Sequence, residues 1–294
     1  RTTLRAMHRA LDTCDLSILG LKGVRDCPAG VPTIPEEQGG FTECEASASA
    51  TEWGWLSKVA SSLKWFTTGR DNNSGKPPLS YLQGDVCWNA EQLQVIRLIA
   101  EIEDRGTVLV WGPPGTGKST VLCQAIWTLL HSSVPSEGTK VLATAPSNAA
   151  ADVLCQKLAR LGVSTQDMLR LNAQGRNFMD IPDEVIPFCN AREQTDTTTS
   201  TSSADDMRFV IPSWQMLLGF RVIICTCSAS SYILSRRPLD QKGCFSHVLV
   251  DEAAEALEPE ALIPLCSLCP PESGRGKVVL AGDFRQLGPI VRSP

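Results

Sequence analysis

The chain has 294 residues, of which 43% are hydrophobic and 20% are charged, and its formal net charge is −5. This balance is typical of a globular protein with a buried core, and it argues against a module that binds nucleic acid through a strongly basic surface. A local grip on a nucleic-acid strand stays open. No apolar run reaches the ~18 residues that span a bilayer, so we expect no membrane partner.

Residues 1–84 carry little periodic signal and are interrupted by Pro, Gly and Ser. We predict an irregular N-terminal region there, at most the remnant of an accessory domain. One stretch differs, because residues 53–66 (WGWLSKVASSLKWF) have the apolar spacing of an amphipathic helix that could dock on a core.

Residues 85–294 have a different texture, in which short apolar runs alternate with helical patterns. The β-branched, continuously apolar runs are typical of parallel strands buried on both faces, and they occupy residues 107–111, 140–145, 221–226, 247–251 and 277–282. Helical patterns lie near residues 89–103, 118–131, 148–161 and 255–265. The alternation predicts one α/β domain with a mainly parallel sheet. The Ser/Thr/Asp-rich run at about 193–206 is interpreted as a solvated insertion.

The chain contains twelve cysteines, and several lie inside the apolar runs. Cys123 and Cys155 fall in helical patterns, and Cys225 and Cys227 fall in or beside a predicted strand. Because buried thiols behave as small apolar groups, we interpret these four as reduced core residues.

The strongest motif is GPPGTGKS, which fits G-x-x-x-x-G-K-[ST] and lies between a predicted strand and a predicted helix. Its glycines let backbone N–H groups curl around phosphates, and the helix N-terminus adds partial positive charge. Lys118 would supply a cation to the β- and γ-phosphates, and the Ser119 hydroxyl would ligate magnesium. We therefore predict binding of ATP with Mg²⁺ by Gly112, Pro113, Pro114, Gly115, Thr116, Gly117, Lys118 and Ser119.

Two further predicted strands end in polar residues. The run HVLV is followed by Asp251 and Glu252, where Asp251 would hold Mg²⁺ through water and Glu252 would orient and deprotonate the attacking water. The run KVVLAG is followed by Asp283 and, three residues later, Gln286. Gln286 could reach a γ-phosphate and sense its loss, because ligands of open α/β sheets sit at the carboxyl ends of the strands. Glu252, Lys118 and Gln286 are the predicted catalytic residues.

Together these motifs resemble the superfamily 1 helicases, and within them the Armitage-like RNA helicases, over residues 85–294. WNAEQ resembles the motif whose glutamine, here Gln92, reads the adenine edge, and DEAA and GDFRQLGP resemble motifs II and III. APSNAAAD and TCSAS resemble the motifs that hold a nucleic-acid backbone, which implies contacts from Ser147, Asn148 and Thr226. The fold implied is a RecA-like P-loop NTPase domain.

Two departures from the family pattern matter. Phe284 stands where motif III usually has proline, and we expect this to be tolerated. The sequence given stops just after motif III, whereas such helicases place ATP between two RecA-like domains, the second of which supplies arginine fingers. An arginine finger is worth ~10³–10⁵ in rate, so this chain is expected to bind ATP but to hydrolyse it slowly without a second RecA-like domain.

The resemblance implies the ATP-binding half of an ATP-dependent RNA helicase, which moves along single-stranded RNA when intact and acts in the cytoplasm or the nucleus. DNA in place of RNA stays open. Two alternatives also stay open. One is a non-catalytic half-motor that clamps RNA or a partner without turnover, and the other is a different P-loop ATPase that acts on DNA or protein.

Overall fold

A computed structural model describes residues 87–100, 106–131, 139–193, 207–241, 243–268, 276–286 and 288–289. Its centre is a six-stranded sheet in which every neighbouring pair of strands is parallel, in the order β1-β8-β7-β2-β6-β3. The strands are β1 (Gly106–Trp111), β2 (Val141–Ala145), β3 (Met168–Arg170), β6 (Val222–Thr226), β7 (His247–Val250) and β8 (Lys277–Gly282). The predicted α/β class with a mainly parallel sheet is confirmed.

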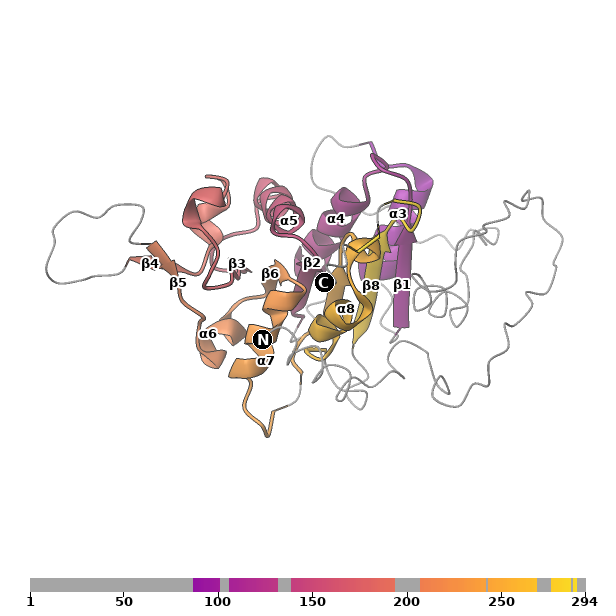
Figure 1. Ribbon diagram of the computed structural model, residues 1–294. Helices are drawn as coiled ribbons and strands as arrows, with labels where there is room; N and C mark the ends of the chain where they lie inside the picture. The colour runs from indigo at the N-terminus through magenta and orange to yellow at the C-terminus, as the bar shows by residue number, and fades with distance from the viewer. Residues whose placement is uncertain are drawn as a thin grey trace, which may run out of the picture.

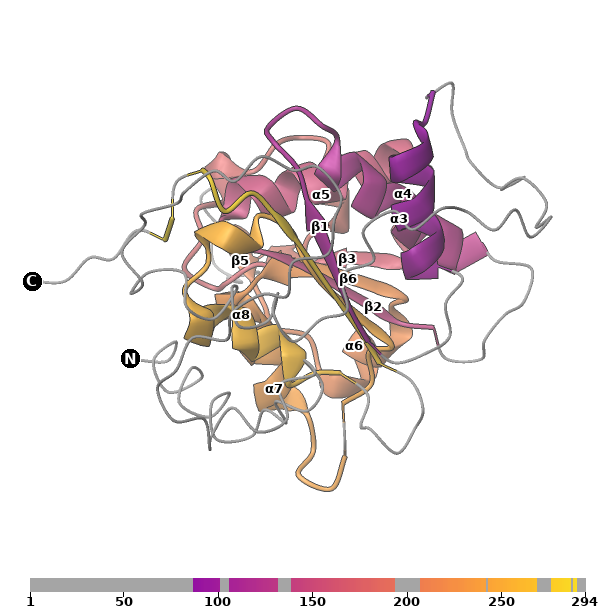
Figure 2. The same ribbon diagram turned by 90° about the vertical axis from the view of Figure 1, so that its right-hand side faces the viewer.

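Helices cover both faces of this sheet (Figure 2). One layer consists of α3 (Ala90–Ala100), α4 (Lys118–His131) and α5 (Asn148–Arg160), in which α4 packs between the other two. The opposite layer consists of α6 (Trp214–Gly219), α7 (Ser231–Arg236) and α8 (Glu258–Leu265). This is the layered arrangement that parallel strands require, because each buries both of its faces.

Alternate residues of each strand feed two separate cores, as the two-residue period of a strand dictates. In β2, Val141 and Ala143 belong to the core under α3, α4 and α5, while Leu142 belongs to the core under α6, α7 and α8. In β6, Ile224 faces the first core and Cys225 the second. The sheet is therefore held from both sides, and its strand ends are fixed positions on which a site can be built.

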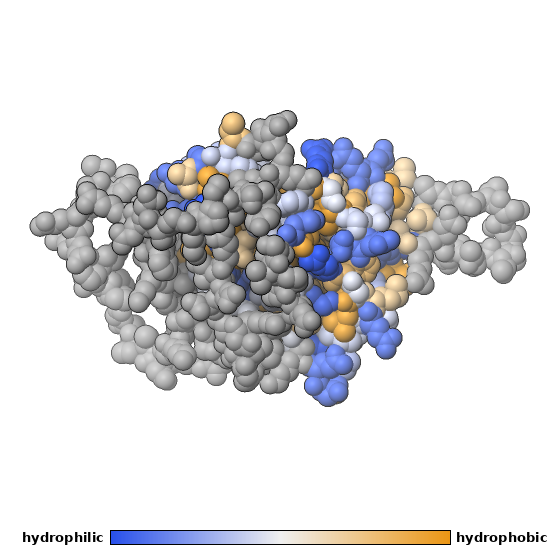
Figure 3. Space-filling model, turned by 180° about the vertical axis from the view of Figure 1, so that it is seen from behind, coloured by the Kyte–Doolittle hydropathy of each residue, from blue (hydrophilic) through white to orange (hydrophobic). Residues whose placement is uncertain are grey.

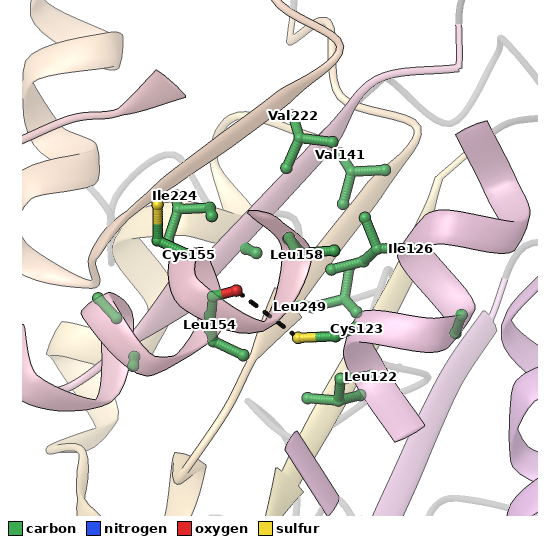
Figure 4. Packing of buried hydrophobic residues seen from close by; sticks show 14 of the residues in the cluster. Leu122, Cys123, Ile126, Val141, Leu154, Cys155, Leu158, Val222, Ile224 and Leu249 are labelled. Atoms are coloured by element: carbon green, nitrogen blue, oxygen red, sulfur yellow. Dashed lines mark hydrogen bonds between the residues drawn. The ribbon is translucent and has the colours of Figure 1, made fainter. Parts of the chain in front are cut away.

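The cysteines lie where the sequence predicts, as free thiols inside these cores. Figure 4 shows Cys123 on α4 beside α5, where its thiol contacts the Leu154 carbonyl at 3.8 Å, and Cys155 packed near Ile224. Burial raises the pKa of the Cys155 and Cys225 thiols to about 12, so both stay protonated at neutral pH. The predicted burial of Cys123, Cys155, Cys225 and Cys227 is confirmed, and their reduced state stays a prediction.

Several elements were not anticipated from the sequence. They are β3 at the sheet edge, helices α6 and α7, and an antiparallel pair formed by β4 (Ala191–Glu193) and β5 (Met207–Phe209). All are short, between three and six residues, so none extends over enough turns or alternations to give a clear periodic signal. The insertion expected at about 193–206 begins at the end of β4, and residues 194–206 lie outside the described residues.

The irregular region 1–84 and the helix expected at residues 53–66 also lie outside the described residues, so both stay predictions. Within the described part of the chain, no helix is both long enough and apolar enough to cross a membrane. Seen from behind, the described surface carries many hydrophilic residues with hydrophobic ones between them (Figure 3).

Candidate nucleotide-binding site

The GPPGTGKS loop connects β1 to α4 at the carboxyl end of the sheet (Figure 1). Gly115 and Gly117 have φ values of +79° and +85°, a backbone conformation that side chains other than glycine rarely adopt. Thr116 closes the loop by donating from Oγ1 to the Pro113 carbonyl at 2.7 Å. The loop therefore curls between strand and helix as its glycines predict.

Lys118 folds back over this loop. Its Nζ donates to the Gly112 carbonyl at 2.7 Å and to the Pro113 carbonyl at 3.3 Å, and the side chain is buried. Carbonyl oxygens satisfy the hydrogens of an ammonium group but do not neutralise its charge. The Lys118 ammonium is therefore held inside the loop, and its positive charge can still attract an anion.

Asp251 follows β7 and lies directly across from the start of α4. Its backbone N–H donates to the Thr144 carbonyl at 2.8 Å, and only 2% of the residue is exposed. Burial raises the pKa of Asp251, while a side-chain hydrogen bond with Ser119 and the charges of Lys157 and Lys118 lower it. A buried carboxylate beside a serine hydroxyl is an all-oxygen donor set of the kind that Mg²⁺ prefers, so the residues present fit a magnesium ion.

Glu252 is the one non-glycine residue with positive φ in the described part of the chain, at φ 51° and ψ 39°. Its backbone N–H donates to Asp251 Oδ1 at 3.1 Å, which supports the left-handed turn. Burial raises the pKa of the Glu252 carboxyl, and the neighbouring Asp251 raises it further while Lys118 opposes. Such backbone strain, of order 1–3 kcal/mol, concentrates at functional sites.

β8 lies between β1 and β7, and it places Asp283 beside both motifs. At Gly282, an added Cβ would meet the backbone nitrogens of Ala254 at 3.1 Å and Ala253 at 3.3 Å, so the strand passes close to the turn after Glu252. The Arg285 N–H, the Trp111 indole and the Gln286 amide all bond to Asp283 and lower the pKa of its carboxyl. Motif I therefore follows β1, motif III follows β8 and motif II follows β7, and these three strands are consecutive in the sheet.

Gln92 lies against the loop from α3. Its Nε2 donates to the Thr116 carbonyl at 3.1 Å, and its Oε1 accepts from the Asn89 N–H at 3.1 Å. Asn89 Oδ1 in turn accepts from the Gln92 N–H at 2.8 Å, which completes a capping box at the start of α3. The amide keeps one N–H and one lone pair free, the two groups with which it could meet an adenine edge.

The residues predicted to contact a nucleic-acid backbone lie elsewhere on the carboxyl edge of the sheet, after β2 and at the end of β6. Ser147 and Asn148 are exposed at the start of α5, where Ser147 caps the helix by accepting from the Ala150 N–H at 3.1 Å. Thr226 ends β6, is half-buried, and accepts from the Ala229 N–H at 3.1 Å through Oγ1. The structure places Ser147 and Asn148 just after β2 and Thr226 at the end of the adjacent strand β6, so none of them belongs to the phosphate-binding loop.

A buried ion network supports this second group and was not anticipated. Arg170, which is 0% exposed, donates from Nε to Asp152 Oδ1 at 2.8 Å and from Nη2 to Asn148 Oδ1 at 3.1 Å. Arg176 pairs with the same Asp152 carboxylate through both of its terminal nitrogens. A fully buried guanidinium requires such a partner, but the sequence shows neither the three-residue strand β3 nor the burial of Arg170.

Comparison with known proteins gives the same picture. The sequence matches the protein family described as an AAA domain over residues 88–211 and 189–294. The chain belongs to this family, among the superfamily 1 helicases of the Armitage type. Curated relatives include "Putative helicase MOV-10" from Gallus gallus, with 34% identity over 70% of this chain and 20% of the relative.

Two other relatives are "RNA helicase Mov10l1" from Mus musculus, with 36% identity over 63% of this chain, and "Regulator of nonsense transcripts 1 homolog" from Neurospora crassa, with 32% identity over 69%. This helicase domain spans 13% and 18% of their lengths, respectively. The chain therefore corresponds to a minor part of each relative, and the family assignment rests on that part.

Proposed function

We propose that this domain binds ATP with Mg²⁺ and hydrolyses it to drive movement along single-stranded RNA, as one half of an ATP-dependent helicase in the intact protein. The observation that carries the proposal is the convergence of Lys118 and Ser119, after β1, with Asp251 and the strained Glu252, after β7, at the same edge of the sheet. The names of the helicase relatives support the same class of activity.

Each side chain has a proposed role in this reaction. Ser119 and Asp251 would hold Mg²⁺, which when bound neutralises phosphate charge. Lys118 would exchange its two loop carbonyls for the β- and γ-phosphate oxygens, which are stronger acceptors because they are charged. Gln92 would meet the adenine edge from its position against the loop.

Glu252 would orient the attacking water and accept its proton. A raised pKa makes a carboxylate a better proton acceptor, provided that it remains ionised at the working pH. Gln286, held against Asp283, would contact the γ-phosphate and register its departure. Transition-state charge would be met by arginines of a second RecA-like domain, which we propose as the partner of this one.

Ser147, Asn148 and Thr226 are the proposed contacts to the strand backbone. Contacts of this kind fix position without reading sequence, which suits a motor that moves along any strand. RNA is proposed as the strand because a relative is named an RNA helicase. The cytoplasm, or else the nucleus, is proposed as the location.

The test is ATP hydrolysis by the full-length protein with no nucleic acid, with single-stranded RNA and with single-stranded DNA of the same length. We expect RNA to raise the rate at saturating ATP by at least about tenfold, because strand binding favours the closed arrangement of the two domains. Equal stimulation by DNA would correct the substrate. No response to either strand would support another P-loop ATPase, and binding of RNA without any turnover would support a non-catalytic clamp.

A further inference from the structure

Trp111 and Phe284 form an exposed aromatic stack at the edge of the nucleotide site. Trp111 is the last residue of β1, directly before the phosphate-binding loop, and Phe284 lies two residues after the end of β8. The two strands run side by side, with Trp111 in register with Gly282 (Figure 1). The ring centroids are 5.5 Å apart at an interplanar angle of 25°, and each residue is 52% exposed.

The Trp111 indole also makes a hydrogen bond that reaches into motif III. Its Nε1 donates to Asp283 Oδ1 at 3.2 Å, and the same oxygen accepts from the Arg285 N–H at 3.0 Å. The other oxygen, Oδ2, accepts from Gln286 Nε2 at 3.2 Å. The Asp283 carboxylate therefore connects the end of β1, on one oxygen, to the Gln286 amide on the other.

The Arg285 guanidinium lies over both rings of the stack. Its guanidinium carbon lies 5.6 Å from the Trp111 ring centroid and 5.8 Å from that of Phe284, within the range of cation–π attraction. Three consecutive residues after Asp283 are thus each bound to Trp111 or to the carboxylate that Trp111 holds. The backbone of this turn is also held by a hydrogen bond from the Gln286 N–H to the Asp283 carbonyl at 3.1 Å, so the contacts of Trp111 act on the side chains of the turn.

We propose that Trp111 is a positioning residue for Gln286: by holding Asp283 it fixes the Gln286 amide relative to the phosphate-binding loop. The inference rests on the proposed function, in which Gln286 contacts the γ-phosphate. It also accounts for the departure in motif III. Proline fixes its own backbone φ, and where this chain has Phe284 the stack on Trp111 supplies the restraint instead.

The sharpest variant is Trp111→Phe, which keeps an aromatic ring for the stack and removes the N–H that reaches Asp283. We expect strand-stimulated kcat of the full-length protein to fall about tenfold while KM for ATP stays within about twofold, as when one hydrogen bond that orients a catalytic group is lost. Phe284→Leu removes the stack and keeps the N–H, so its kcat should fall less.

Trp214→Phe is the matched control. Trp214 on α6 donates from Nε1 to Gln241 Oε1 at 2.6 Å, away from the nucleotide site, so the same atomic change there should leave kcat unaltered. The pathway through Gln286 is tested by combining variants. In a Gln286→Ala background, Trp111→Phe should cause no further loss, because the amide to be positioned is gone.

An unchanged kcat in Trp111→Phe would overturn the inference, and so would an equal loss with and without Gln286. If the wild-type protein hydrolyses no ATP, the proposed function fails, and the inference is tested by the affinities of the variants for ATP and ADP. Trp111→Phe should then narrow the preference for ATP over ADP about as much as Gln286→Ala does, with ADP affinity unchanged. A preserved preference would count against Trp111 as a positioning residue.

Discussion

The carboxyl edge of the sheet has two halves that treat buried charge in opposite ways. After β1, β8 and β7, Asp251 is buried near the charges of Lys157 and Lys118 but forms no ion pair within the described part of the chain, and Lys118 donates to neutral carbonyls. After β2, β6 and β3, Asp152 is shared by Arg170 and Arg176, so its charge is met within the fold. The first half has charges that a ligand can neutralise. In the second half, a buried and neutralised ion network supports exposed residues at the start of α5.

One sheet therefore serves two tasks at a single edge. A buried charge that no ion pair neutralises destabilises the folded chain, and the binding of a complementary ligand recovers that energy. A neutralised network stabilises the positions of the residues around it, here Asn148 at the start of α5. The two halves should therefore respond differently when single charges are removed.

The largest effect on folding is expected at Arg170. Arg170→Met removes a fully buried guanidinium and breaks one of the two pairs made by Asp152, so the free energy of unfolding should fall by about 3 kcal/mol. Urea unfolding measures it. The matched control is Arg160→Met, whose pair with Glu184 has side chains 68% and 56% exposed and should contribute below about 1 kcal/mol. Equal losses would contradict a special role for the buried network.

A smaller, pH-dependent effect is expected at His247, the first residue of β7. Burial and the charge of Lys277 lower the pKa of His247 from 6.5 to about 4. Since the unfolded chain takes up this proton more readily, stability is present above pH 6.5 and is lost as the pH falls towards 4. Between pH 7 and pH 5 the wild type should lose about 2 kcal/mol more than His247→Gln.

Unfolding of both proteins at the two pH values measures this difference, and the carboxylates that they share cancel in the comparison. A loss of the same size in His247→Gln would mean that other groups carry the pH dependence. His247 lies at the amino end of β7, so nucleotide affinity at pH 7 should be the same in both proteins.

The smallest effect is expected at Asn148, which is exposed in the second half of the edge, and it concerns the affinity for RNA. Asn148→Ala should weaken binding of single-stranded RNA about threefold to tenfold, the contribution of one hydrogen bond to a phosphate, and leave KM for ATP unchanged. Fluorescence anisotropy with labelled RNA measures the affinity. Gln166→Ala, which removes an exposed amide before β3, is the control. A change in KM for ATP without a change in RNA affinity would contradict the proposed contact of Asn148 with RNA and would link this residue to nucleotide binding instead.

The sequence predicts the nucleotide half better than the second half for a physical reason. Phosphate binding needs glycines, a lysine and a hydroxyl at fixed spacing within one loop, so Gly112 to Ser119 and the strand that ends at Asp251 were identified directly. Five of the six strands of the sheet were also predicted, because each is a continuous apolar run. The predicted roles of the site residues stay predictions.

The second half depends on contacts between segments far apart in the chain. Arg170 meets Asp152 across 18 positions, a separation that gives no periodic pattern in the sequence. In the nucleotide half, the contact between Trp111 and Asp283 spans 172 positions and escapes sequence reasoning for the same reason. Strand β3 has three residues, too few for an alternation to be distinguished from a loop. Such pairings become visible only when the fold brings the segments together.

The most direct test of the central claim is the change Glu252→Gln in the full-length protein, with RNA-stimulated hydrolysis and ATP affinity measured on the same preparation. We expect kcat to fall by about 10²–10⁴ while ATP still binds, because the carboxylate that accepts the proton is lost and the loop is intact. Glu255→Gln, an exposed carboxylate three residues away, should retain most of the activity. Hydrolysis that continues unchanged in Glu252→Gln would contradict the account.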